Sequence, residues 1–275
     1  MDQWILVTGC SSGIGYASLR PLKEAGFKVI ATCRKPEDIE RVTNEGYHCL
    51  SLELDDPTSI AECAEAVATL TAGKLYALFN NAAYGQPGAL EDLPVAALKA
   101  QFNTNFFGWH DLTQRLLPLM YNNGQARIIQ NSSVLGFAAM KYRGAYNASK
   151  FALEGYTDTL RIELSDTPIK VSLIEPGPIE TRFRANALKA FLCWISPDNS
   201  RHTAQYQTQI QRLDKEQSGS PFVLPASSCI PPLLHALTSR KPKPRYRITT
   251  PTKVFAVLKR LLPTRLLDKI LSKAT

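Results

Sequence analysis

The sequence predicts an α/β fold, a doubly wound Rossmann-type parallel sheet of about seven strands with helices on both faces. Short, continuously apolar, β-rich runs alternate with longer segments of helical periodicity. Continuous apolar runs are typical of strands buried on both faces, and helices between them are typical of right-handed crossovers. The first run also leads directly into a glycine-rich turn and a helix. Sheets of this kind bind ligands beyond the carboxyl ends of their strands.

The predicted elements follow in chain order. The apolar runs are residues 3–8, 27–33, 47–53, 75–80, 126–132 and 169–175. Helical patterns cover residues 13–25, 57–72, 94–121 and 145–165. Near residue 178 the pattern changes, and we predict an irregular substrate loop over residues 178–220. Residues 252–275 form a basic amphipathic extension with a helix break at Pro263. We predict a single domain over residues 1–275.

Composition narrows the functional classes. The 275 residues are 44% apolar with a net charge of +8, and no apolar run approaches the roughly 20 residues that span a bilayer. The six cysteines contain no Cys-x-x-Cys pair and the four histidines are dispersed, so we expect neither disulfides nor a metal site. Basic residues lack accompanying base-stacking aromatics, so no nucleic-acid partner is expected. The expected location is cytoplasmic.

The turn after the first predicted strand is TGCSSGIG, residues 8–15. Gly9, Gly13 and Gly15 permit a tight turn, close approach of the backbone to a phosphate, and close packing of the next helix. The N-terminus of that helix supplies N–H groups for a pyrophosphate. No Gly-Lys-Ser/Thr follows, which argues against a P-loop ATPase. A dinucleotide site is therefore predicted at this turn.

A second motif, YNASK at residues 146–150, sets Tyr146 four residues before Lys150 in a helical pattern. Residues at this spacing share a helix face. A cation beside a phenol favours the phenolate form, so the pair can exchange a proton near neutral pH. The same spacing also suits an ordinary core contact beside a solvated charge. The remaining motifs decide between the two interpretations.

Taken together, the motifs resemble those of the short-chain dehydrogenase/reductase family in its single-domain branch. The resemblance covers nearly the whole chain. It rests on six motifs in the family's order, which are TGCSSGIG (8–15), NNAA (80–83), NFFG (105–108), SSVLG (132–136), YNASK (146–150) and EPGPIET (175–181). One position departs from the family pattern, because Ala83 replaces a glycine and bears on how closely the cofactor packs there.

The resemblance implies a catalytic set of Asn105, Ser133, Tyr146 and Lys150. Tyr146 would protonate the carbonyl oxygen, Ser133 would hydrogen-bond it, and Lys150 would lower the phenol pKa and bind the nicotinamide ribose. Asn105 would hold a water that links Lys150 to solvent. Ser132 is an alternative to Ser133, which the thirteen-residue spacing to Tyr146 favours.

The implied cofactor is NADP(H). Arg34, with Lys35, follows Cys33 at the place where NAD-preferring members carry an acid, and a guanidinium can pair with a 2′-phosphate. Alternatively, Arg34 is solvated and pairs with Glu37 or Asp38. Glu53 or Asp55 would contact adenine. The implied cofactor-binding residues are Gly9, Ser11, Ser12, Gly13, Ile14, Gly15, Arg34, Lys35, Glu53, Leu54, Asn81, Ala82, Ala83, Tyr146, Lys150, Pro176, Gly177, Ile179 and Thr181.

The expected substrate is a small apolar aldehyde or ketone, or the corresponding alcohol. The predicted loop offers an apolar wall consisting of Phe183, Leu188, Phe191, Leu192, Trp194 and Ile195. The chain is most similar to bacterial NADP-dependent aldehyde reductases related to retinol and 17β-hydroxysteroid dehydrogenases. Two alternatives remain, an NADP(H)-sensing protein with little turnover and a sugar-nucleotide epimerase or dehydratase.

Two further expectations concern partners. The resemblance implies a homo-oligomer, either a dimer or a tetramer. The helices predicted in residues 252–275 either pack over the substrate cleft or a subunit interface, or attach peripherally to the anionic inner face of a membrane.

Overall fold

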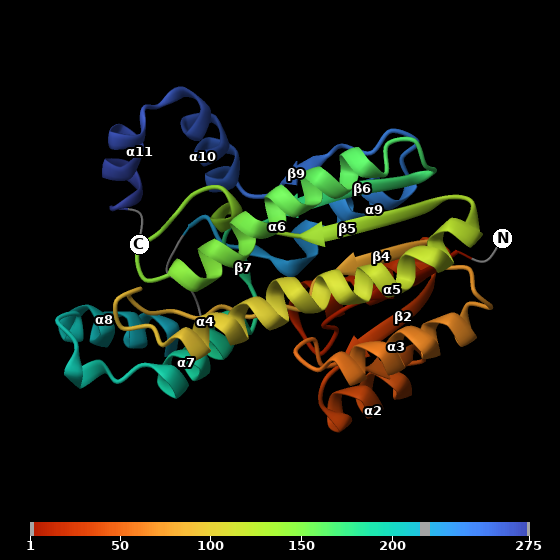
Figure 1. The fold of residues 1–275 in the computed structure, drawn as a ribbon, viewed down its shortest axis with the longest axis horizontal. Helices are drawn as coiled ribbons and strands as arrows, with labels where there is room; N and C mark the ends of the chain where they lie inside the picture. Colours follow the sequence, from red (N-terminus) through yellow and green to blue (C-terminus); the bar gives the residue numbers. More distant parts are fainter. Residues whose placement is uncertain (1–2, 215–220, 274–275) are drawn as a thin grey trace.

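A seven-stranded parallel sheet forms the centre of the structure, in the order β3-β2-β1-β4-β5-β6-β9 (Figure 1). The structure is a computed structural model that describes residues 3–214 and 221–273. The order reverses between β1 and β4, which creates the switch point where such sheets bind ligands. The strands are β1 (Trp4–Val7), β2 (Lys28–Cys33), β3 (His48–Ser51), β4 (Ala77–Asn80), β5 (Ala126–Asn131), β6 (Ile169–Glu175) and β9 (Arg245–Arg247).

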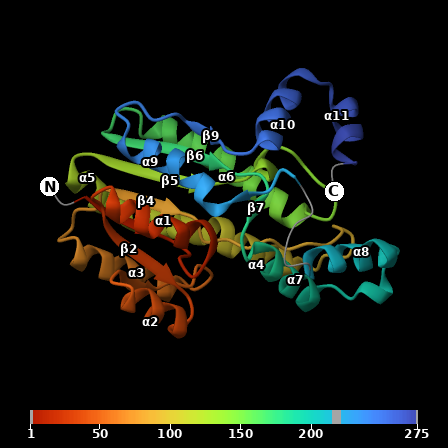
Figure 2. The same cartoon turned by 180° about the vertical axis from the view of Figure 1, so that it is seen from behind.

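Helices cover both faces of this sheet (Figures 1 and 2). One face packs against α3, α5 and α6, where Val67, Trp109 and Leu153 are buried. The other face packs against α1, α2 and α9, which contribute Leu19 and Leu237 among others. The bounds are α1 (Gly13–Glu24), α2 (Pro36–Asn44), α3 (Pro57–Leu70), α4 (Val95–Phe102), α5 (Gly108–Asn123), α6 (Gly144–Glu163) and α9 (Ile230–Thr238). The predicted fold class is confirmed.

The seventh strand, β9, was not among the six predicted runs. Its sequence RYR contains a single apolar residue. Instead, Arg245 and Arg247 form ion pairs with the buried Glu175 of β6, at 3.1 and 3.0 Å. A long-range charge contact of this kind leaves no periodic signal in the sequence.

Two differences in the helices bear on the site. The helix predicted over residues 94–121 contains a π-helical turn at Asn103–Phe107, between α4 and α5. The irregular loop predicted over residues 178–220 is wrong for the part that the structure describes. That segment contains β7 (Ile179–Glu180), α7 (Phe183–Trp194), a 3-10 turn (Pro197–Asn199) and α8 (Thr203–Asp214), whereas 215–220 lie outside the described residues.

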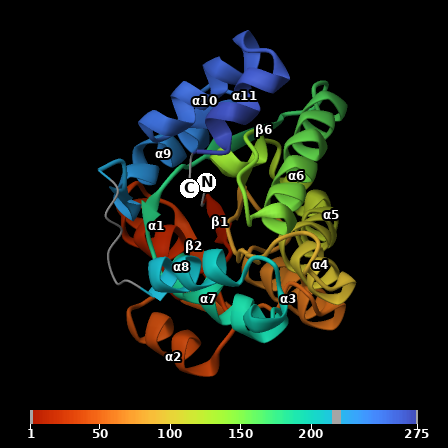
Figure 3. The same cartoon turned by 90° about the vertical axis from the view of Figure 1, so that its left-hand side faces the viewer.

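Helices α7 and α8 have a small core of their own, which explains their order. Phe191, Ile195 and Tyr206 are buried together with Ala89. The Tyr206 hydroxyl accepts a hydrogen bond from Ala89 N and donates to Asp92. The strand β7 pairs with β8 (Leu224–Pro225), which is followed by a 3-10 turn at Ala226–Cys229. The pair α7 and α8 lies beside the carboxyl ends of the strands (Figures 1 and 3).

The C-terminal extension forms α10 (Thr250–Leu261) and α11 (Thr264–Leu271), with the predicted break at Pro263 confirmed. Leu267 and Leu271 of α11 pack against Val134 and Ala138, in and beside the 3-10 turn Val134–Gly136 that follows β5. The extension therefore packs next to the segment that carries Ser133. None of the helices in the described ranges is long and apolar enough to cross a membrane.

Candidate active site

The glycine-rich turn is built around positions that exclude a side chain. Gly9 and Gly13 have left-handed φ values of +74° and +63°. A Cβ on Gly9 would come within 2.7 Å of Ala82 Cα, and one on Gly15 within 2.3 Å of the Gly9 carbonyl oxygen. Ser12, the N-cap of α1, makes no side-chain capping bond. The first N–H groups of α1 therefore keep the geometry that binds a phosphate.

Polar side chains join the ends of three strands around this turn. Asn81 Nδ2 donates to the Thr8 carbonyl at 2.9 Å, and Asn131 Nδ2 donates to Asn81 Oδ1 at 2.8 Å. Ala82 N donates to Thr8 Oγ1 at 2.9 Å. The segment after β4 is thus fixed against the glycine-rich turn, so the two predicted halves of the dinucleotide cradle meet.

The segment after β6 closes the other side of the cradle. A Cβ on Gly13 would lie 3.1 Å from Thr181 Cγ2, so Thr181 stands beside the turn. A Cβ on Gly177 would come within 2.1 Å of Thr249 Oγ1, which leaves no room for another residue. Pro176 accepts a hydrogen bond from Val134 N at 2.7 Å through its carbonyl oxygen. These contacts place Thr181 beside the glycine-rich turn and fix Pro176 and Gly177 against Val134 and Thr249.

At the end of β2, Arg34 pairs with Glu53 rather than with Glu37 or Asp38. Arg34 Nη1 lies 3.3 Å from Glu53 Oε2, and the Arg34 side chain is 67% exposed. Burial is the main cause that raises the pKa of Glu53, while Arg34 opposes that rise. The residues predicted to hold the 2′-phosphate and the adenine are therefore neighbours.

Arg41 of α2 was missed by the sequence analysis. Its Nη2 donates to the Ser11 carbonyl of the glycine-rich turn at 2.9 Å. It also pairs with Asp38 at 3.0 Å and with Glu45 at 3.3 Å. The only signal in the sequence is a basic residue within the helix that follows Arg34, and that signal is too general to identify a site.

The predicted catalytic groups lie on three elements. Tyr146 and Lys150 are one turn apart on α6 and both are buried, while Ser133 directly precedes the 3-10 turn after β5. Ser133 Oγ accepts from Leu135 N at 3.1 Å. Burial raises the pKa of Tyr146 to about 12, and a hydrogen bond from Ser133 opposes the rise. Ser133, rather than Ser132, is thus the serine in contact with the phenol.

Lys150 is held by groups on both sides of its ammonium. Its Nζ donates to the Asn131 carbonyl at 2.7 Å and lies 4.4 Å from the centroid of the Trp109 ring. Burial lowers the pKa of Lys150 to about 7, although Glu154 opposes that shift. The ammonium lies over the Tyr146 ring, 5.8 Å from its centroid. The pKa of the phenol is raised in this structure because burial outweighs the hydrogen bond with Ser133.

Asn105 lies fully buried in the π-helical turn between α4 and α5. Its Nδ2 donates to the Tyr84 carbonyl at 2.8 Å, and its Oδ1 accepts from Tyr84 N at 3.1 Å. These bonds fix the segment after β4 to the helix. Turns of this type occur frequently at functional sites, because they break the regular backbone ladder.

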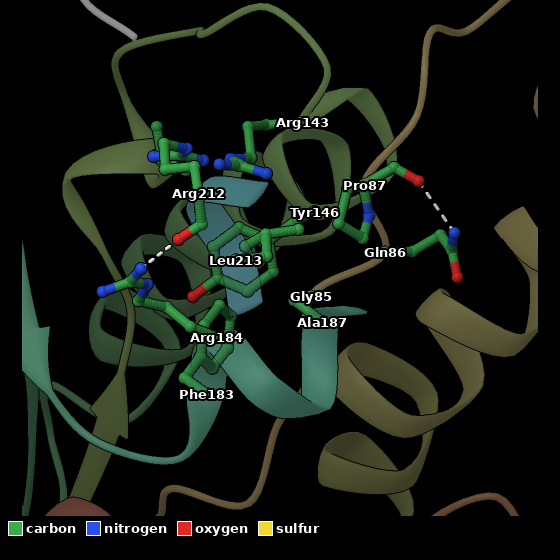
Figure 4. Close-up of a pocket in the computed structure, with 11 residues that line it drawn as sticks. Gly85, Gln86, Pro87, Arg143, Tyr146, Phe183, Arg184, Ala187, Arg212 and Leu213 are labelled. Atoms are coloured by element: carbon green, nitrogen blue, oxygen red, sulfur yellow. Dashed lines mark hydrogen bonds between the residues drawn. The ribbon is translucent and has the colours of Figure 1, made fainter. Parts of the chain in front are cut away.

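A cavity of about 100 Å³ lies beside Tyr146 (Figure 4). The Tyr146 and Phe183 rings meet edge to face, with centroids 5.3 Å apart. Of the six apolar residues predicted to form a wall, Phe183 alone lines this cavity. Phe191 and Ile195 are buried in the α7–α8 core, and Leu192 is 59% exposed. The complete lining is Gly85, Gln86, Pro87, Leu135, Arg143, Tyr146, Phe183, Arg184, Ala187, Arg212 and Leu213.

Metal-ligating side chains form no cluster of three or more within residues 3–214 and 221–273. The cradle formed by Gly9, Gly13 and Gly15 fits a dinucleotide, because Gly9 and Gly13 take left-handed backbone conformations and Gly15 lets α1 pack closely on the Gly9 carbonyl.

Comparisons with known proteins agree with this geometry. A protein-family model described as short chain dehydrogenase matches residues 3–190. The uncharacterized oxidoreductase YbbO of Escherichia coli K12 is 44% identical over 272 residues, which cover 98% of this chain and 94% of that protein. The NADPH-dependent 3-dehydrocapnine reductase of Ornithobacterium rhinotracheale is 31% identical, covering 98% of this chain and 96% of that protein.

Human retinol dehydrogenase 8 is 36% identical over 74% of this chain and 67% of its own length. Among solved structures, a short-chain dehydrogenase from Streptomyces avermitilis superposes with a TM-score of 0.78 at 26% identity, covering 98% of this chain and 93% of that chain.

Proposed function

Since the chain belongs to the short-chain dehydrogenase/reductase family, we propose that it is an NADP(H)-dependent oxidoreductase acting on an apolar aldehyde or ketone, or on the corresponding alcohol. The observation that carries this proposal is the position of Tyr146. Its buried side chain lines the cavity and contacts Ser133, one helical turn from Lys150.

The roles of the residues follow from their surroundings. NADPH, when bound, supplies a hydride to the carbonyl carbon. Tyr146, whose pKa of about 12 keeps it protonated, holds the proton that the carbonyl oxygen requires. Ser133 hydrogen-bonds the same oxygen and orients it. Positioned proton transfer contributes typically about 10²–10⁴-fold, and a donor aimed at the developing oxyanion contributes a further large factor.

Lys150 and Asn105 act around this pair. The pKa of Lys150, lowered to about 7, lets its amine exchange a proton with the surroundings at neutral pH. Its bond to the Asn131 carbonyl holds it in place on the cofactor side of Tyr146. Asn105 is fixed by its hydrogen bond to Tyr84. In this position it would hold the water that links Lys150 to solvent.

The preference for NADP(H) is supported by the cations near the end of β2. Arg34 and Lys35 directly follow β2, and Arg41 donates a hydrogen bond to the Ser11 carbonyl of the glycine-rich turn. The name of the Ornithobacterium relative includes NADPH dependence. To bind the 2′-phosphate, Arg34 would exchange its ion pair with Glu53 for one with the phosphate. Because Arg34 is exposed, breaking the Glu53 pair costs little free energy.

Location and assembly belong to the same proposal. All six cysteines are free thiols, which agrees with a reducing cytoplasmic compartment. A dimer or tetramer is supported by exposed apolar side chains on α5 and α6, such as Tyr121 and Ile162. Size-exclusion chromatography with light scattering measures the subunit number directly.

The test of the function is the loss of NADPH absorbance with a panel of aliphatic and aromatic aldehydes. We expect turnover with apolar aldehydes and much weaker turnover with NADH. Tight NADPH binding without turnover of any aldehyde, ketone or alcohol would instead indicate an NADP(H)-sensing protein.

A further inference from the structure

Three arginines stand at the cavity beside Tyr146, and hydride transfer uses none of them. Arg143 directly precedes α6, Arg184 lies on α7 and Arg212 lies on α8. Figure 4 shows the guanidinium groups of Arg143 and Arg212 on the same side of the cavity. Arg184 donates a hydrogen bond to the Arg212 carbonyl, so the two helices are joined at this point. The three side chains come from separate parts of the sequence and converge only in the fold.

No acidic group among the described residues balances the positive charge of this cluster. No aspartate or glutamate lines the cavity, and none of the three arginines has an ion pair within the ranges that the structure describes. The Nε of Arg212 is shielded from solvent and has no hydrogen-bond partner. Elsewhere in the molecule, partly buried arginines such as Arg245 and Arg247 do pair with carboxylates.

An unpaired, partly buried cation is costly because the surroundings replace its hydration poorly. The pKa of Arg212 is lowered by burial, which has the same physical origin. An anionic group beside the guanidiniums of Arg143 and Arg212 would offset this cost. The planar fork of arginine matches the oxygens of a carboxylate or a phosphate in particular.

We propose that the substrate carries an oxyanion, held by Arg143 and Arg212, while its carbonyl oxygen faces Tyr146. The inference rests on the proposed oxidoreductase function and adds the class of substrate. Most of the cavity wall is apolar, including Leu135. The substrate is therefore amphipathic, with a short apolar spacer between the carbonyl and the anion, because the cavity is only about 100 Å³ in volume.

Matched aldehydes test this inference. We use para-formylbenzoate and its methyl ester, which share the aromatic aldehyde and differ in charge. The wild type should reduce the acid with a kcat/KM at least about 10-fold higher than that for the ester, as a charge-assisted contact predicts. In Arg143→Gln this preference should be lost through a higher KM for the acid. Arg143→Lys should restore part of the preference.

Arg182→Gln is the matched control, because Arg182 is exposed and lies outside the cavity lining. This variant should keep the wild-type preference. If it loses the preference to the same extent as Arg143→Gln, the effect is one of overall charge and the inference is overturned.

A binding measurement keeps the oxyanion site testable without turnover. Benzoate and phenyl phosphate should raise the melting temperature of the wild type more than neutral benzamide does, and Arg143→Gln or Arg212→Gln should remove the difference. The stronger of the two anions identifies a carboxylate or a phosphate as the source.

The two proposals fail in different ways. Reduction of the ester with no preference for the acid, together with anions that stabilise no more than benzamide, overturns the oxyanion site and leaves the oxidoreductase standing. Anion binding that depends on Arg143, without reduction of either aldehyde, supports the oxyanion site and contradicts the proposed function.

Discussion

The cofactor side and the substrate side of the cleft are built by different means. On the cofactor side, short motifs at the strand ends contain positions that only glycine can occupy. Gly9 has a left-handed φ, and a Cβ on Gly15 would collide with the Gly9 carbonyl oxygen. On the substrate side, helices α7 and α8 present side chains to the cavity beside Tyr146. The family model stops at residue 190, so most of this second region lies beyond it. A binding site that depends on backbone conformation leaves a short motif in the sequence. A binding site formed by side chains from separate helices leaves no such motif.

The largest effect is expected for the substitution Tyr146→Phe. Because the phenol holds the transferred proton, kcat for carbonyl reduction should fall by at least about 10²-fold. NADPH binding, measured by fluorescence titration, should change little, since the glycine-rich turn is untouched. Near-normal turnover of the purified variant would remove Tyr146 from the mechanism and break the assignment of chemistry to this motif.

The second test concerns the edge of the cofactor side, where Arg34 is a partner of Glu53. A charge-assisted bond to the 2′-phosphate is worth roughly 1.5–3 kcal/mol, so NADPH should be preferred over NADH by about 10–100-fold. Arg34→Ala should reduce this preference, as measured by kcat/KM for each cofactor with one aldehyde.

Lys35→Ala and Arg41→Ala are the matched controls for this prediction. An unchanged preference in Arg34→Ala, with a loss in either control, would transfer the role to that residue. Equal or better use of NADH by the wild type would contradict NADP(H) specificity altogether.

How far the sequence predicts the molecule follows the same division. The six apolar runs located six strands, because a strand buried on both faces must be apolar throughout. The seventh strand escaped, because Arg245 and Arg247 reach Glu175 across a long sequence separation. Similarly, TGCSSGIG and YNASK predict candidate site residues from a local pattern, whereas Arg41 and Arg212 lie on helices that carry no motif. The raised pKa of the phenol could not be predicted either, since it depends on burial.

A third test measures how much the buried ammonium of Lys150 destabilises the folded protein. The pKa of Lys150 is about 7 in the folded protein, against 10.5 for an ordinary lysine. Below pH 7 both the folded and the unfolded states are protonated, and the cost of burying the charge is complete. Between pH 7 and 10.5 the unfolded state binds more protons, so wild-type stability rises with pH relative to a variant without this group.

The melting temperature of Lys150→Met minus that of wild type should therefore be largest below pH 7. It should fall by a few degrees as the pH rises toward 10, as differential scanning fluorimetry can follow. Lys141→Met, at an exposed lysine, supplies the baseline. A difference that stays constant with pH, or that grows, would mean that the buried ammonium is not destabilising.

The smallest expected effect belongs to the C-terminal extension. One face of the extension packs on Val134 and Ala138 through α11, in agreement with the packing alternative. On α10, however, Val254, Val257 and Leu261 are 48, 55 and 73% exposed at a spacing that places them along one stripe. Basic residues flank this stripe, as in helices that lie on anionic membranes. We propose that both alternatives hold, with α11 packing and α10 contacting a membrane surface peripherally.

The protein should then co-sediment weakly with vesicles that contain phosphatidylglycerol at low salt, and less with neutral phosphatidylcholine vesicles. Val257→Ser together with Leu261→Ser should reduce the bound fraction a few-fold. These substitutions leave the Leu267 and Leu271 packing intact, whereas deletion of residues 252–275 would remove it.

Ile162→Ser on α6 is the control, because that exposed side chain lies on a different element and should not affect binding. If the wild type stays in the supernatant with both kinds of vesicle, α10 is not a membrane contact. The extension would then serve only to cover the segment beside Ser133.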